Sequence, residues 1–133
     1  MTEKNYDLSY FINQNKDYEN TFKAGSSDNY IDLNLDREVI IECLRKVFDP
    51  ELPVSIYDLG LIYKIDFLEN GKIYIEMSLT APACPVAGEL PKEVAQKVST
   101  VYGVGEVEVK LVWEPAWTKD RMSEDAKLLL GID

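Results

Sequence analysis

The sequence predicts an α+β fold, a small two-layer α/β sandwich with helices on one face of a sheet. Two neighbouring stretches, 61–67 and 73–79, alternate apolar and polar residues with the period of half-buried strands. A stretch with the apolar period of a helix follows, and a third alternating stretch comes after it. The chain has 133 residues, 46% of them hydrophobic, which suits one domain with its own core. The expected order of elements is α-β-β-α-β-α.

The first helix is expected to begin after Asp36, whose side chain can cap it, and to run to about Phe48. Cys43 falls in the apolar stripe of this helix, which predicts a small buried thiol. The loop after the helix is stiff, because Pro50 and Pro53 lack amide hydrogens and restrict the residues before them. The stripe consists of Val39, Ile40, Cys43, Leu44 and Val47.

The connection between the first two strands, Glu69-Asn70-Gly71, sets their register. A two-residue turn at Asn70 and Gly71 would put the two apolar sets on opposite faces of the hairpin. A three-residue loop with a bulge and a left-handed Gly71 pairs residue 67 with 73 and 65 with 75, so the faces agree. The apolar sets are residues 61, 63, 65 and 67 on one strand and 73, 75, 77 and 79 on the other.

The second helix is expected to start at Pro85 or nearer Gly88 and to run to about Tyr102. Pro91 argues against the earlier start, because a proline inside a helix removes a hydrogen bond and crowds the preceding turn. The expected inner face consists of Leu90, Val94, Val98 and Val101.

A third strand is expected over 106–113, followed by a turn and a short last helix. Ser123 can cap this helix and Gly131 can end it. The inner face of the strand consists of Val107, Val109, Leu111 and Trp113.

Residues 1–34 differ in composition from residues 35–133, which form the expected domain. They are polar and charged with interspersed aromatic residues and no clean period, which predicts a mobile or loosely docked extension. Alternatively, the aromatic side chains dock on the domain or on a partner as a short helix.

The composition excludes several function classes. A net charge of −10 disfavours nucleic acid and anionic membranes as partners. No apolar run reaches the ~18 residues of a membrane span, and the first residues do not form a signal peptide, so a cytoplasmic location is expected. The chain has no histidine, which excludes Ser-His and Cys-His nucleophile pairs within it. No self-contained catalytic constellation is visible, and we expect a protein that is not an enzyme.

Cys84 is the first candidate site residue. It lies between Pro82 and Pro85, after a predicted strand and before a predicted helix, where free backbone amides would favour a thiolate. The prolines would hold the sulfur stiffly in place. The alternative is a structural cysteine in a tight turn. Because Cys43 is expected to be buried elsewhere, a metal held by Cys84 would have to be shared with a second copy, a partner or a small thiol.

Two further groups are candidates. The carboxylates of Asp49, Glu51 and Asp58 could contact a cation or a basic partner, or could cap turns and helix ends. The aromatic group Tyr102, Trp113 and Trp117 is expected to fill the core, although an exposed Trp117 could anchor a partner.

Several segments together resemble the MIP18 family, also called DUF59, including its bacterial SufT-like members. Thr80, Asp49, Glu51 and Asp58 stand at motif positions, and the resemblance covers about residues 36 to 133. The segments are Asp49-Pro50-Glu51-Leu52-Pro53-Val54, Ile56-Tyr57-Asp58-Leu59-Gly60-Leu61-Ile62-Tyr63, Leu79-Thr80-Ala81-Pro82-Ala83-Cys84-Pro85 and Val112-Trp113-Glu114-Pro115-Ala116-Trp117.

This resemblance implies the iron–sulfur cluster assembly (FSCA) domain fold. It also implies an accessory role in iron–sulfur cluster assembly or delivery in a SUF-type pathway, with Cys84 as the reactive residue. Expected partners are the assembly machinery, client apoproteins and, as a possible homodimer, a second copy. A transient iron or iron–sulfur cluster is the expected cofactor. Two alternatives stay open: a protein-interaction adaptor without a metal step, and a thiol redox or transfer enzyme.

Overall fold

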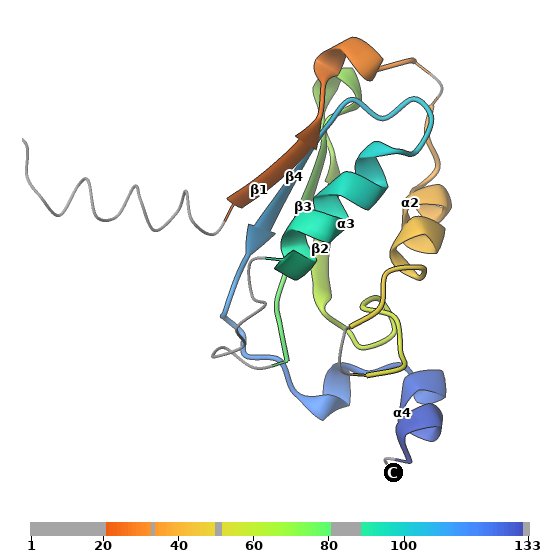
Figure 1. The fold of residues 1–133 in the computed structure, drawn as a ribbon, viewed down its shortest axis with the longest axis vertical. Coiled ribbons are helices and arrows are strands. Elements are labelled where there is room, and N and C mark those ends of the chain that lie inside the picture. The colour runs from red at the N-terminus through yellow and green to blue at the C-terminus, as the bar shows by residue number, and fades with distance from the viewer. Residues whose placement is uncertain (1–20, 33, 50–51, 81–88, 132–133) are drawn as a thin grey trace, which may run out of the picture.

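The computed structural model describes residues 21–32, 34–49, 52–80 and 89–131. Its centre is a four-stranded mixed sheet in the order β1-β4-β3-β2 (Figure 1). The strands are β1 (Thr21–Gly25), β2 (Ile62–Phe67), β3 (Ile73–Met77) and β4 (Glu106–Leu111). β3 and β4 run parallel, whereas β2 and β1 lie antiparallel to their neighbours. The predicted α+β class and helix-on-sheet layering are confirmed.

The hairpin of β2 and β3 has the predicted register. Phe67 pairs with Ile73 and Ile65 with Ile75. Gly71 is left-handed, with φ 72°, and Asn70 also has a positive φ, 58°, which asparagine tolerates better than most residues. A short 3₁₀ turn, η2 (Glu69–Gly71), closes the hairpin.

The predicted inner face of β2 is only partly correct. Leu61 and Ile65 are buried, but Tyr63 is half-buried and Phe67 is 37% exposed. The register shifts between Ile62 and Lys64, so Tyr63 is an extra residue in the strand. A bulge of this kind breaks the strict two-residue alternation on which the prediction depended.

Residues 21–25 correct the expected boundary of the domain. They were expected to belong to a mobile or loosely docked extension, but they form β1, which pairs with β4 from Thr21↔Lys110 to Gly25↔Glu106. Phe22 and Ala24 pack against the core from this strand. These residues form a strand because they pair with β4, which is distant in the sequence. The composition of a short polar segment does not indicate such pairing.

The helices α2 (Arg37–Leu44) and α3 (Glu89–Ser99) lie on one side of the sheet (Figure 1). The short helix α4 (Glu124–Leu130) lies at the far end, next to η3 (Lys119–Arg121), and η1 (Ser27–Asn29) follows β1. The core between sheet and helices is aliphatic, and its fully buried members include Ile40, Leu44, Ile73, Ile75, Val94, Val98, Val107 and Val109.

The predicted helix caps are confirmed, but both long helices end early. Asp36 accepts a hydrogen bond from the Glu38 amide, and Ser123 accepts one from Ala126. α2 stops at Leu44 rather than Phe48, and α3 stops at Ser99, so Tyr102 is 72% exposed instead of core.

The apolar stripe of α2 is rotated from its predicted position. Val39 is 45% exposed, while Ile41, which was outside the predicted stripe, is buried. Pro91 is compatible with α3 because it is the third residue of the helix that the structure describes. Amides in the first turn have no hydrogen-bond partner within the helix, so the proline removes no bond there. No helix among the described residues is long and apolar enough to cross a membrane.

Candidate functional site

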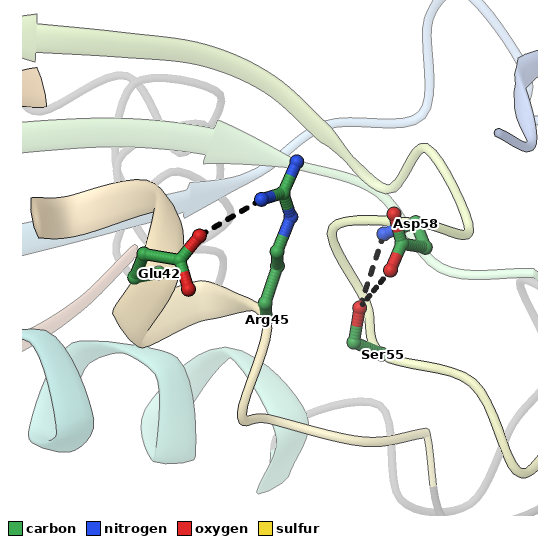
Figure 2. Close-up of polar contacts among 4 residues, drawn as sticks. All are labelled: Glu42, Arg45, Ser55 and Asp58. Atoms are coloured by element: carbon green, nitrogen blue, oxygen red, sulfur yellow. Dashed lines mark hydrogen bonds and ion pairs between the residues drawn. The ribbon is translucent and has the colours of Figure 1, made fainter. Parts of the chain in front are cut away.

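The loop after α2 returns on itself and presents Asp58. Ile56 donates its amide to the carbonyl of Val47, which holds the two ends of the loop together. The Ser55 hydroxyl donates to Oδ2 of Asp58 at 3.1 Å and accepts from the Asp58 amide at 3.2 Å (Figure 2). Ser55 is buried, so this pair fixes the turn that follows. Of the readings open for Asp58, these contacts favour turn capping.

Gly60 allows the C-terminal part of the chain to pack on this turn. Its φ is +80°, and a Cβ at this position would collide with the backbone carbonyl of Arg121. The amide of Ser123 donates to the carbonyl of Asp58 at 2.8 Å. The residue that caps α4 is therefore hydrogen-bonded directly to the turn of Asp58.

Trp117 and Tyr63 strengthen the same junction. The indole nitrogen of Trp117 donates to the carbonyl of Leu59 at 2.6 Å, and the hydroxyl of Tyr63 donates to the carbonyl of Pro115 at 2.9 Å. The guanidinium of Arg121 lies 4.2 Å from the centre of the Tyr63 ring, within the range of a cation–π contact. Trp117 is half-buried against the core, so these contacts make it a structural anchor.

Thr80 is the last described residue before segment 81–88. Two residues earlier, the amide of Ser78 donates to the carbonyl of Leu61 at 2.8 Å, next to Gly60. The turn of Asp58, the approach to segment 81–88 and the segment of Trp117 therefore meet at one end of the sheet, although they are far apart in sequence.

Comparison with known proteins shows the family of the chain. The family described as "Iron-sulfur cluster assembly protein" matches residues 37–109. The chain belongs to this family. It is 50% identical over 95 residues to an "Fe-S protein maturation auxiliary factor" of Porphyromonas gingivalis, covering 71% of this chain and 90% of the relative. It is 44% identical over 96 residues to the auxiliary factor YitW of Bacillus subtilis, covering 72% and 94%.

A solved structure of the same family is also similar. A domain of unknown function DUF59 from Bacillus anthracis superposes with a TM-score of 0.68 at 43% identity, covering 72% of this chain and 92% of that one. The resemblance noted in the sequence is therefore confirmed, as is the fold that it implied.

Four of the predicted site residues, Cys84, Pro82, Pro85 and Glu51, lie outside the described residues. Their roles stay predictions. Among the residues that the structure does describe, no three His, Cys, Asp or Glu side chains gather closely enough to hold a metal ion. The Asp49 amide donates to the carbonyl of Val54 at 3.4 Å and so helps to close the loop.

Cys43 belongs to α2 and is half-buried rather than fully buried. Its thiol donates to the carbonyl of Lys97 at 3.4 Å. Burial raises the pKa of the Cys43 thiol, although the charges of Lys46 and Lys97 act in the opposite direction. A raised pKa keeps this sulfur protonated, and a protonated thiol is a poor nucleophile and metal ligand.

Arg45 is a residue of this site that the sequence analysis missed. Its guanidinium donates to Glu42 at 2.8 Å and lies 5.2 Å from the centre of the Tyr57 ring. The hydrogen bond to Glu42 is the main cause that raises the pKa of Arg45, and the charge of Asp58 contributes in the same direction. Figure 2 shows the Arg45 side chain pointing toward Glu42, with the Ser55–Asp58 pair drawn separately from it. The i,i+3 spacing of Glu42 and Arg45 on a helix could have indicated the ion pair.

Proposed function

We propose that this chain is a non-enzymatic accessory factor that helps to assemble iron–sulfur clusters or to deliver them to client apoproteins. The observation that carries the proposal is the family match over residues 37–109, which includes the whole segment from Thr80 to Pro85. Auxiliary maturation factors among the relatives support it.

We propose further that Cys84 contacts the cargo, an iron ion or a cluster, transiently and together with a second molecule. The half-buried thiol of Cys43, whose pKa is raised by burial, is a poor ligand. The second molecule is another copy of the chain, a component of the assembly machinery or a client. With such partners, the expected compartment is the cytoplasm.

The junction of the Asp58 turn with the Trp117 segment supports a positioning role at the strand end that leads toward this cysteine. Its hydrogen bonds join Trp117 and Ser123 to the turn of Asp58, and the amide of Ser78 donates to Leu61 at the end of the same turn. A rigid support of this kind limits the positions that the following residues can take. In this proposal Asp58 and Trp117 orient the site, and neither contacts the cargo.

The test compares Cys84→Ser with the matched variant Cys43→Ser. Each variant replaces the protein in cells grown under iron limitation, and the activity of an iron–sulfur enzyme such as aconitase is measured together with the amount of its polypeptide. We expect Cys84→Ser to lower the activity per polypeptide several-fold and Cys43→Ser to leave it unchanged. Wild-type activity with Cys84→Ser would exclude the role of Cys84 and favour an adaptor without a metal step.

Binding is measured separately on the purified chain. Anaerobic incubation with iron and sulfide, followed by absorbance spectroscopy and mass measurement, should detect a cluster that depends on Cys84. A cluster of equal stoichiometry in Cys84→Ser would contradict direct ligation by this residue.

A further inference from the structure

Arg37, the first residue of α2, makes an unusual contact with the sheet. Its Nη2 donates to the backbone carbonyl of Ile65 at 2.9 Å, and its guanidinium lies 5.6 Å from the centre of the Phe67 ring. Ile65 and Phe67 belong to β2, which is an edge strand. A side chain from a helix therefore occupies a hydrogen-bonding position on the outer edge of the sheet that the described residues form.

The hydrogen-bond pattern shows which groups of β2 face outward. Leu68 donates its amide to the carbonyl of Lys72, so residue 68 faces β3. Antiparallel pairs alternate, so residues 64 and 66 also face β3, and the backbone groups of 65 and 67 point away from the sheet. An edge of this kind is a template for pairing with another strand.

The residues of β2 are self-complementary about Ile65. If two copies paired antiparallel with Ile65 opposite Ile65, Lys64 of each copy would lie opposite Asp66 of the other. These two side chains already attract within one chain, at 3.4 Å. The pairing centre would be the outward amide and carbonyl of Ile65, and Arg37 covers that carbonyl.

Protection is uneven along the strand. The bulge at Tyr63 discourages pairing in the first half of β2. In the second half of β2, the side chain of Arg37 binds the outward carbonyl of Ile65. The neighbouring Phe67 and Leu68 are partly exposed.

We propose that Arg37 closes the β2 edge against a second copy of this chain. Removal of its guanidinium exposes a self-complementary strand, and two copies then pair through β2 in the register centred on Ile65. This device is independent of the proposed function in iron–sulfur cluster assembly.

The test is sedimentation velocity over a concentration series with Arg37→Ala, and with Arg45→Ala as the matched control. Both variants lose an exposed arginine with a cation–π contact, but Arg45 is not on the sheet edge. We expect Arg37→Ala to self-associate at least tenfold more tightly than the wild type and Arg45→Ala to match the wild type. Equal association of Arg37→Ala and the wild type would overturn the proposal.

Two further measurements separate edge pairing from general destabilisation. Pairing should slow hydrogen exchange at the outward amide of Ile65, whereas local unfolding would accelerate it. Adding Lys64→Glu to Arg37→Ala places like charges opposite each other and should abolish the association. Association that survives Lys64→Glu, or leaves the Ile65 amide unprotected, would refute the register. Arg37→Gln replaces Arg37→Ala if circular dichroism shows the latter to be unfolded.

Discussion

The two tryptophans near the C-terminus differ by one hydrogen bond. Both are half-buried against the core, but only Trp117 has a described hydrogen bond from its indole nitrogen, to the carbonyl of Leu59. A buried carbonyl that loses its donor keeps the cost of desolvation without the compensating bond. The polar end of Trp117 therefore stabilises the junction in a way that Trp113 does not.

Comparing Trp117→Phe with Trp113→Phe isolates this bond, because the two substitutions remove the same atoms. We expect Trp117→Phe to lower the free energy of unfolding by about 1 kcal/mol more than Trp113→Phe. Urea denaturation followed by circular dichroism measures the difference. Equal losses would show that the indole hydrogen bond contributes nothing net to stability.

Among the elements, the turn at 55–61 and the η3–α4 segment depend on each other. Gly60 has a positive φ, and its missing side chain leaves room for the backbone of Arg121. Gly131, which ends α4, has a similar φ of +71°, but a Cβ added there would meet no atom within 4 Å. Both glycines thus need a positive φ, but only at Gly60 would an added side chain overlap with neighbouring atoms.

Alanine at each position separates strain from packing. We expect Gly131→Ala to cost about 1–2 kcal/mol, the penalty of a left-handed L-residue. Gly60→Ala should cost roughly 2–5 kcal/mol, because overlap with Arg121 adds to that penalty. Thermal and urea unfolding of both variants provide the comparison. If the two variants lost equal stability, the close approach of Gly60 to Arg121 would have no energetic weight.

At the scale of the whole molecule, β1 completes the sheet. It covers the outer side of β4 and adds Phe22 and Ala24 to the core. Without it, β4 would become an exposed edge with buried, aliphatic residues on its inner face. The folded unit therefore includes residues that the composition assigns to an extension.

Two truncations that differ only in β1 and the following turn test this boundary. A chain that begins at Thr21 is compared with one that begins at Ile31. We expect the shorter chain to be less stable by on the order of 3 kcal/mol, from lost apolar burial, and to aggregate more readily. Urea unfolding and light scattering measure both effects. Equal stability would place the domain boundary near residue 34 after all.

The sequence by itself determined the class of fold, most of the core and the family. Alternating strands, the Asp36 and Ser123 caps and the register at Asn70-Gly71 are local signals, because turn chemistry and side-chain period act over a few residues. The motif segments identified the family for the same reason, since residue identity and order are visible in a single sequence.

Tertiary structure decided the rest. β1 forms because it pairs with β4. The exposure of Tyr102 depends on where α3 ends, and the bulge at Tyr63 depends on the pairing of β2 with β3. The junction of the Asp58 turn with Trp117 and the contact of Arg37 with Ile65 join residues that are 58 and 28 positions apart. Such contacts form only when long-range packing brings the segments together, so no local pattern could predict them.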